Sequence, residues 1–443
     1  MTVPQASIRP VILGGDIGAY ATARAFHEAF GVRSVVVAGI STGAVARSRI
    51  VDHRIVGDLD SAATLVAALR AIAAEEPERT HIVLGSADWF VHTLSEHRAE
   101  ILADRTNVVV PYVDTRTLDA VTDKAAFSRL CAELDIPHPR TRVVRVGAAE
   151  DVDGELTFPV VVKAASSTDF HAVEFVGKRK VDIVPDAASL RALLARMVQA
   201  GFAGEVVVQE FVGGGDEQMA AVNAFCGPDG GVEFLLFGQV LLEEHTPNGL
   251  GNSVAQITGG ADAHDEAVSH ARRLLEHVGW SGFANLDMKR DPRDGTYRFL
   301  ELNPRVGRSG YAVTAAGYNV GKMYARAYAS PPDGPEALDG SEALDGPEAL
   351  DAPGMPPGTG SGMGPMDGVV ATNEHLFTVV PLALLKRYVS PPVWERIRSL
   401  RKRGAVTNPY LYAVERDPRR WAYIAVAMVN QFRKFAEHHR PSG

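Results

Sequence analysis

Residues 10–110 alternate short, continuously apolar runs with segments of helical periodicity. Three of the runs, PVILGG, SVVVAGI and HIVLGS, have the length of strands, and the segment between Gly18 and Phe30 has the spacing of a helix. Strands that are apolar on both faces belong to a parallel sheet covered by helices. This alternation predicts an α/β layer domain over residues 1–115.

The turn after the first run, GGDIGAY, is rich in glycine but lacks the GxGxxG spacing of a dinucleotide site. An NAD-dependent oxidoreductase would also carry an acidic residue at the end of its second strand. Here Ser41 and Thr42 follow SVVVAGI, which disfavours that class. Tight packing between strand and helix is the simpler interpretation of Gly14, Gly15 and Gly18.

The length and the net charge of the chain limit the number of its domains and the class of its partners. A chain of 443 residues is too long for one hydrophobic core, and it predicts about two to four domains. The net charge of −9 argues against nucleic acid as the main partner. Cys131 and Cys226 stand in no metal-binding spacing and fit a reducing compartment. We see no signal peptide and no apolar run long enough to span a membrane, so we expect a cytoplasmic protein.

The last quarter of the chain changes in composition twice. Residues 331–368 repeat a six-residue unit in PEALDGSEALDGPEALDAPG, and their composition predicts a disordered linker without catalytic residues. Residues 369–443 regain helical patterns, and residues 371–443 hold 13 Lys and Arg against 5 Asp and Glu. A solvated basic face is one interpretation. The other is a face for an anionic partner, such as a diphosphate-linked precursor or, by peripheral contact, a membrane surface.

The segment RFLELNPRVGRSGY, at 298–311, concentrates polar residues at the end of an apolar strand. Glu301 and Asn303 are two residues apart and share one strand face. The preceding strand, SGFANLDMKRD, brings Asp287 opposite them if the two strands form a hairpin around residues 293–295. Carboxylate and amide oxygens suit magnesium, and Arg305 could neutralise a phosphoryl group being transferred.

Two lysines could meet phosphate. Lys163 ends the apolar run FPVVVK, and a lysine at the end of a buried strand is costly unless an anion meets it. Snorkelling at the sheet edge is the alternative. Lys124 begins a helical segment predicted over 121–136, where its charge opposes the helix dipole. A bound anion or simple exposure to solvent would each explain it.

The order Lys124, Lys163, QEFV (209–212), Asp287 and ELNPR (301–305) resembles the ATP-grasp superfamily over roughly residues 10–330. The resemblance implies a mixed α/β and α+β fold, with a Rossmann-like N-terminal domain followed by two α+β subdomains that grip ATP. These would occupy residues 116–330, the smaller lid at about 141–210 and the larger subdomain at about 211–330. The loop after Lys163, ASSTDFH, departs from the family because it has Ser and Thr where many members have glycine.

The resemblance also implies roles for individual residues. Lys124 and Lys163 look like the phosphate lysines, with Lys163 and Arg305 as the catalytic residues. Glu210, Phe211 and Val212 look like the hinge that meets adenine, and Glu217 is similar to the acid that binds ribose, with Asp216 as a competitor. The implied magnesium ligands, for two ions, are Asp287, Glu301 and Asn303.

The implied reaction is carboxylate–amine ligation. ATP converts a carboxylate to an acyl phosphate, and an amine attacks it to give an amide, ADP and phosphate. Three stretches, KAASSTDF with GKRKV, VLLEEHTPNGLGN, and the tail with LFTVVPLALLKRYV and NPY, narrow the resemblance to the D-aspartate ligase group. That group attaches D-aspartate to the side-chain amine of peptidoglycan precursors, and on this basis Arg308 and His245 would face substrate.

Two alternatives stay open. One is an amino-acid or peptide ligase of another biosynthetic pathway. The other is a nucleotide-binding regulator that has kept the fold and lost turnover. A regulator of that kind would be expected to lose part of its metal set, but Asp287, Glu301 and Asn303 are all present.

Overall fold

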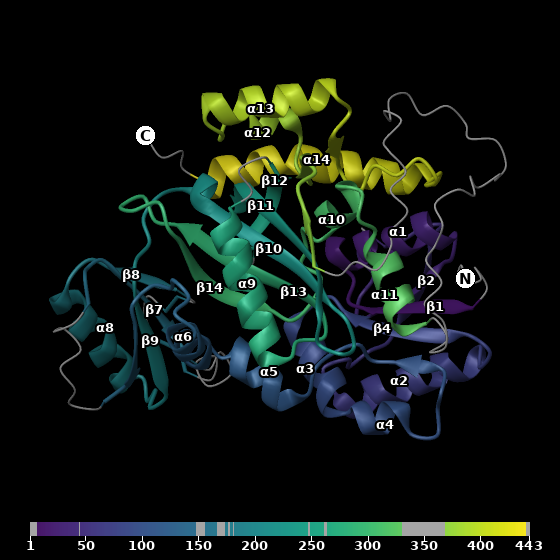
Figure 1. Ribbon diagram of the computed structural model, residues 1–443, viewed down its shortest axis with the longest axis horizontal. Coiled ribbons are helices and arrows are strands. Elements are labelled where there is room, and N and C mark those ends of the chain that lie inside the picture. Colours follow the sequence, from purple (N-terminus) through teal and green to yellow (C-terminus); the bar gives the residue numbers. More distant parts are fainter. Residues whose placement is uncertain are drawn as a thin grey trace. The chain divides into compact units, whose positions relative to one another are not determined.

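The computed structural model describes residues 7–43, 45–147, 156–165, 173–175, 178–179, 181–246, 249–260, 264–329 and 368–439 (Figure 1). The linker expected at 331–368 lies outside these residues except for its last position, and so does most of the loop after Lys163. The chain divides into two compact units. The first unit comprises Met1–Thr115, Ala220–Asn285 and Asn303–Gly443, and the second comprises Arg116–Met219 and Leu286–Leu302.

The first unit contains the predicted parallel sheet. Its five strands run in the order β3-β2-β1-β4-β5, and all of its neighbouring strands are parallel. The three apolar runs are strands as predicted, and the sheet gains two further strands at its edges. The strands are β1 (Ile8–Leu13), β2 (Ser34–Ala38), β3 (Val51–Ile55), β4 (Thr80–Gly85) and β5 (Val108–Val109).

Helices connect these strands, as the alternating pattern predicted. Helix α1 (Ile17–Phe30) begins where the Asp16 carboxylate accepts a hydrogen bond from the amide of Ala19, and it ends at Gly31 in the left-handed conformation. The other helices are α2 (Ala62–Glu75), α3 (Asp88–Glu96) and α4 (Arg98–Leu102).

A second, larger sheet lies mostly in the first unit, although half of β13 and nearly all of β14 belong to the second. It has eight strands, in the order β14-β13-β10-β11-β12-β16-β17, with β15 paired to β11. The predicted strand at 232–242 is part of it, and so is the predicted hairpin. The strands are β10 (Met219–Cys226), β11 (Val232–Glu244), β12 (Asn252–Thr258), β13 (Gly282–Arg290), β14 (Tyr297–Asn303), β15 (Val369–Ala371), β16 (His375–Thr378) and β17 (Val406–Thr407).

One hydrophobic core joins the parallel sheet to this larger sheet. Phe26 on α1 shares it with Phe225, Phe283 and Tyr324, all of which are fully buried. Gly321 lets α11 approach α1 closely, because a Cβ atom there would lie 3.0 Å from the Cα of Phe26. The helices that accompany the larger sheet include α9 (Asp265–Val278), α10 (Tyr311–Ala315) and α11 (Val320–Tyr328).

The C-terminal region belongs to the first unit. Helices α12 (Leu382–Leu385), α13 (Pro391–Lys402) and α14 (Pro418–His438) share a core with β12 and β16, at the top of Figure 1. Within the part of the chain that is described, none of the helices has both the length and the apolar character needed to cross a membrane.

A buried polar network fastens this region to the N-terminal helix. The carboxylate of Glu415, which is 2% exposed, accepts hydrogen bonds from the Tyr20 hydroxyl, the Ser48 hydroxyl and the Arg49 amide. Its charge is balanced by the buried guanidinium of Arg420, at 3.8 Å. These contacts make the C-terminal region an integral part of the first unit.

The second unit is built on an antiparallel sheet of four strands in the order β6-β9-β7-β8. Its strands are β6 (Thr141–Arg145), β7 (Val160–Ala164), β8 (Asp182–Val184) and β9 (Glu205–Glu210), packed with α8 (Ala187–Gln199). The single helix predicted over 121–136 is wrong in extent. Helix α5 (Thr115–Thr122) ends before Asp123, whose side chain accepts from the Ala126 amide and starts α6 (Lys124–Glu133).

Candidate functional site

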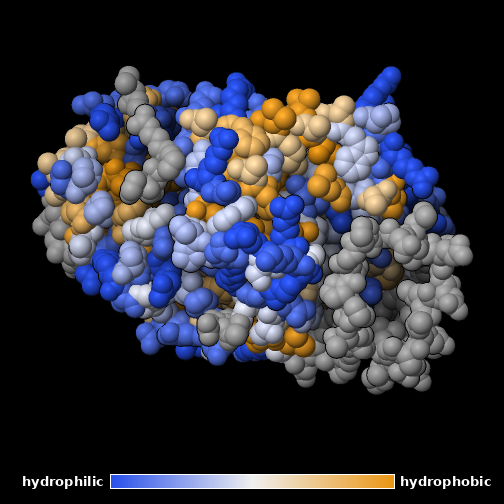
Figure 2. Space-filling view, turned by 90° about the horizontal axis from the view of Figure 1, so that it is seen from above, coloured by the Kyte–Doolittle hydropathy of each residue, from blue (hydrophilic) through white to orange (hydrophobic). Residues whose placement is uncertain are grey.

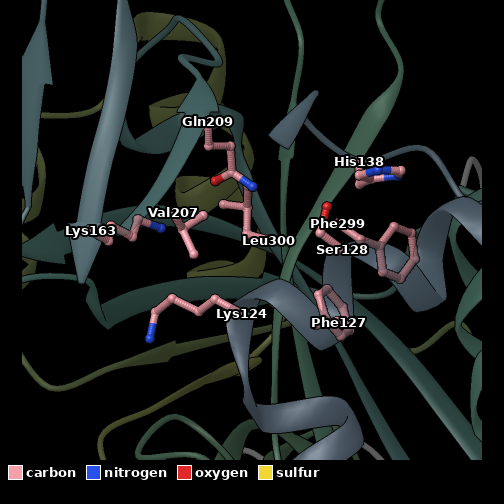
Figure 3. Close-up of a pocket in the computed structure, with 9 residues that line it drawn as sticks. All are labelled: Lys124, Phe127, Ser128, His138, Lys163, Val207, Gln209, Phe299 and Leu300. Carbon is pink, nitrogen blue, oxygen red and sulfur yellow. The ribbon is translucent and has the colours of Figure 1, made fainter. Parts of the chain in front are cut away.

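Lys124 and Lys163, predicted separately, line one pocket of the second unit. Lys124 is the first residue of α6, and Lys163 lies on β7. In Figure 3 the two lysines lie on one side of the pocket, and the rings of Phe127 and Phe299 lie on the other. Two ammonium groups repel each other, so this side favours a polyanion, while the aromatic side suits a flat, apolar group. The pocket fits the chemistry of a nucleotide.

Backbone pairing fixes the walls of this pocket. Lys163 is paired with Val207 on β9, and Gln209 on the same strand donates from its amide nitrogen to the Thr141 hydroxyl at 3.0 Å. The Phe299 amide donates to the Pro137 carbonyl at 2.8 Å, which holds β14 against the connection between α6 and β6. The lysines are therefore presented by anchored elements, not by a free loop.

The predicted hinge begins at the last residue of β9. Its first amide, on Glu210, donates to the Arg140 carbonyl, and the Phe211 amide donates to the Pro159 carbonyl. The Glu210 carboxylate accepts from the Thr157 amide at 2.9 Å. Because these groups already have protein partners, contacts with adenine would fall to the carbonyl oxygens of this segment and to Val212.

Glu217 lies on the short 3-10 helix η1 (Asp216–Gln218), with Asp216 beside it. Both side chains are half-buried, so the structure does not choose between them as the acid that would meet ribose. The role of Glu217 stays a prediction.

The predicted metal ligands lie on neighbouring strands. Asp287 is on β13 and Glu301 and Asn303 are on β14, which are adjacent in the sheet. Asn303 contacts Asn285 directly across the two strands. In an antiparallel hairpin this pairing sets Asp287 opposite Glu301, two residues further along each strand. In that pairing the three side chains would share one sheet face, and their role as metal ligands stays a prediction.

An amide network orients Asn303. Its side-chain nitrogen donates to the Asn285 side-chain oxygen at 3.2 Å, and Asn285 in turn donates to Asn223 at 3.4 Å. With its nitrogen so engaged, Asn303 presents its oxygen on the other side, where Arg305 donates to it at 3.4 Å. An oxygen held outward in this way is what a magnesium ligand requires.

Arg305 and Arg308 meet two acids at the edge of the parallel sheet. The Nε of Arg305 lies 2.6 Å from Asp88, which follows β4, and the Nε of Arg308 lies 3.1 Å from Asp16, which follows β1. Strands β1 and β4 are neighbours, and the strand order reverses between them. That is the switch point at which ligands bind in open α/β sheets. The predicted catalytic loop therefore lies at the ligand-binding edge of the N-terminal sheet.

These ion pairs do not engage every N–H donor of either guanidinium. Within the described residues, the Nε–H of each arginine is buried but not aimed at an acceptor, so the pairing is by charge and not by a hydrogen bond. A guanidinium carries five N–H donors, so the nitrogens other than Nε could still meet a substrate carboxylate.

Packing at the switch point requires glycine at position 14 and leaves little spare room at position 18. A Cβ atom on Gly14 would lie 1.9 Å from the Ser86 hydroxyl, and Gly14 also has a positive φ of 116°. A Cβ atom on Gly18 would lie 3.4 Å from the backbone of Arg308. These contacts agree with the packing interpretation of the glycine-rich turn.

Tyr410, from the NPY segment, lies close enough to Arg308 and Asp16 to sense both charges. Burial raises the pKa of Tyr410 to about 12, against the opposing effect of the Arg308 guanidinium. The phenol therefore stays protonated near neutral pH and can donate a hydrogen bond to an anion.

His245 lies elsewhere in the first unit. Its ring stacks on that of His439 at 4.0 Å, nearly parallel, and His439 stacks in turn on Tyr388. The stack ties the end of β11 to the end of α14. A structural role explains this placement, and a role in substrate binding stays a prediction.

Comparisons with known proteins now decide the family. No family model matches the chain. Over 321 residues the chain is 30% identical to the D-aspartate ligase of Enterococcus faecium (strain Aus0004), and the match covers 71% of the chain and 75% of that ligase. The chain belongs to the ATP-grasp carboxylate–amine ligase family. This confirms the resemblance drawn from the motif order.

Solved structures agree on the ATP-grasp fold. The L-amino acid ligase from Bacillus licheniformis superposes with a TM-score of 0.51 at 15% identity, over 72% of this chain and 74% of that one. The biotin carboxylase domain of the Hydrogenobacter thermophilus 2-oxoglutarate carboxylase, solved with MgADP, gives 0.53 at 14% identity, over 73% and 70%. The expected ATP-grasp fold is confirmed.

Several residues that the motif order did not reveal support this ATP-grasp ligase site. Asp16, Asp88, Asn285 and Asn223 hold the arginines and the amide ligand. Lys289 shares the face of Asp287 and donates from its ammonium group to the Gly214 carbonyl at 2.8 Å, beside the hinge. The alternation of Asn285, Asp287 and Lys289 on one strand face was the available signal.

Proposed function

We propose that this ATP-grasp ligase joins D-aspartate to the side-chain amine of a peptidoglycan precursor. The observation that carries the proposal is the pair of arginines at the switch point. Arg305 and Arg308 lie three residues apart, each faced by its own carboxylate. An amino acid with two carboxylates could place one carboxylate against each arginine. Asp16 would then lose its ion pair with Arg308, and the ammonium group of the amino acid could pair with Asp16 in its place.

The chain's residues divide the work of such a reaction. Arg305 would neutralise the carboxylate being activated and the oxygens of the acyl phosphate, and Arg308 would hold the second carboxylate. Lys163 and Lys124 would hold the phosphates of ATP, and Glu210, Phe211, Val212 and Glu217 would meet its nucleoside. A carboxylate oxygen bonds to the γ-phosphorus as ADP leaves. The acceptor nitrogen then bonds to the carbonyl carbon as phosphate and a proton leave.

The donor set fits magnesium. Asp287 and Glu301 offer carboxylates on facing strands, and the Asn303 oxygen is held outward by its amide network. Asp287, Glu301 and Asn303 would hold the two hard cations that we propose. When bound, magnesium would neutralise the triphosphate and polarise its γ-phosphoryl group.

The test is phosphate release from ATP and Mg²⁺ with a panel of D- and L-amino acids, with and without a muropeptide acceptor. We expect turnover with D-aspartate only when the acceptor is present, and a product heavier by one aspartyl residue in mass spectrometry. Turnover with a different acid would keep the ligase and overturn the substrate. ATP binding without turnover across the whole panel would contradict the proposed activity and favour a regulator.

A further inference from the structure

Helix α14 has one face in the core and one face in solvent. Residues Arg420, Ile424 and Phe435 are buried at helical spacing against the rest of the first unit. The opposite face is the outer stripe of α14, whose members are all exposed and repeat about once per turn. The members up to Arg433 are Arg419, Ala422, Tyr423, Val426, Val429 and Arg433, and the exposed Glu437 follows one turn later on the same face.

The middle of the outer stripe is apolar to an unusual degree for a surface. Val426 is 69% exposed and Val429 is 71% exposed, and Tyr423 beside them is 52% exposed. A run of large apolar side chains along one exposed helix face marks a contact surface more often than scattered exposure does. Figure 2, seen from above, shows that hydrophobic and hydrophilic residues lie side by side on the surface of the molecule that faces the viewer.

Several arginines of the C-terminal region are paired with acids, so fewer positive charges are available there than the composition suggests. Arg396 and Arg403 both pair with Glu374, and Arg398 pairs with Glu395. Arg419 and Arg433, in contrast, stand exposed at the two ends of the outer stripe. Arg433 donates only to the neutral side chain of Asn430 among the hydrogen bonds found for it. Their charge therefore remains available to an anionic partner.

We propose that the outer stripe of α14 binds the surface of an anionic lipid bilayer. Cations at both ends of the stripe match anionic headgroups, and Tyr423 suits the interface between headgroups and acyl chains. The short valine side chains would reach only the boundary of the acyl region, so the contact is peripheral and reversible.

Charge placement favours a bilayer over a second copy of the chain. Arg419 and Arg433 lie at equal distances from Val426 along the helix. Two copies related by a two-fold axis at the middle of the stripe would set arginine against arginine at both ends, in parallel or antiparallel pairing. Like charges in facing positions are unfavourable, whereas an anionic surface meets both at once.

The experiment is flotation of the full chain with vesicles of phosphatidylglycerol and phosphatidylcholine, compared with vesicles of phosphatidylcholine alone. We expect binding only to the anionic vesicles, and weaker binding at higher salt. The double variant Val426→Asn, Val429→Asn should bind about tenfold more weakly or worse, since it removes the apolar contact. Arg419→Ala with Arg433→Ala should also lose about tenfold at low salt.

Ile55→Asn is the matched control, because Ile55 is 52% exposed and lies on the edge strand β3 of the parallel sheet. It should bind vesicles like the wild type. Unchanged binding by the valine variant, or no binding by the wild type, would overturn the proposal. So would a wild-type dimer that the valine variant dissociates, which would make the stripe an interface between copies. Flotation needs no turnover, so this inference and the substrate proposal can fail separately.

Discussion

Replacing Glu301 by alanine should abolish ATP turnover and leave folding intact. Glu301 lies on β14 with its side chain exposed, between the buried Leu302 and the half-buried Leu300. An exposed strand carboxylate contributes little to folding, so the free energy of unfolding should change by no more than about 0.5 kcal/mol. The expected loss therefore belongs to the chemistry.

The size of that loss follows from the proposed ligand set. Asp287 and Glu301 are the two carboxylates that would hold magnesium, and Asn303 is neutral. Removing one of two charged ligands should cost about 4 kcal/mol of transition-state stabilisation, which is about a thousandfold in kcat/KM. Glu301→Gln keeps the shape and one oxygen, so it should need more magnesium for half-maximal rate.

The assay is phosphate release during a magnesium titration, with circular dichroism and denaturant unfolding to report the fold. Glu205→Ala is the matched control, since Glu205 is also an exposed strand carboxylate, on β9 of the second unit. It should retain wild-type turnover and the wild-type magnesium requirement. If Glu301→Ala turned over ATP within about twofold of Glu205→Ala, the metal assignment would be wrong.

Four further outcomes are expected. Glu415→Ala should lower the free energy of unfolding by about 3 kcal/mol, because it leaves the buried guanidinium of Arg420 without its ion-pair partner. Denaturant unfolding of this variant and of Glu415→Gln measures the difference. Burial lowers the pKa of His375 to about 4, so the folded state resists protonation of this side chain. The contribution of His375 to the free energy of unfolding should be complete above pH 6.5 and should be lost as the pH drops toward 4. Between pH 7 and 5 the free energy of unfolding should therefore fall by about 2 kcal/mol more in the wild type than in His375→Gln. Arg308→Lys should raise KM for the acid about tenfold without changing KM for ATP, because an ammonium group cannot form the bidentate pair, and initial rates separate the two. Deleting residues 334–362 should leave turnover within about twofold, since their composition predicts no packed structure, and a large loss would give them a role in activity.

Local patterns in the sequence predicted the elements that are decided locally. The continuous apolar runs gave β1, β2 and β4, and the period of two along RFLELN placed Glu301 and Asn303 on one face. The break between α5 and α6 was missed because capping by Asp123 interrupts a periodicity that otherwise continues. The ATP-grasp fold itself followed from the order of separated motifs.

Local sequence patterns could not predict contacts between residues that are far apart in the chain. Nothing in RVGRSGY shows that Arg305 would meet Asp88 or that Arg308 would meet Asp16, since both acids are distant from it in the sequence. Counting the charges of the C-terminal region was misleading for a related reason, because a count does not show which charges are paired. They gave the C-terminal region a large positive excess, but the structure pairs Arg396 and Arg403 with one acid and buries Arg420.

The C-terminal region is the part whose interpretation changes most. Its composition predicted a basic helical region, and the structure adds that Glu415 within it accepts hydrogen bonds from Tyr20 and Ser48. Arg24 on α1 also donates to the Pro409 carbonyl, one residue before Tyr410. Helix α1 begins at Asp16, the acid that faces Arg308. The same helix thus contacts the C-terminal region and begins next to Asp16 at the proposed substrate site.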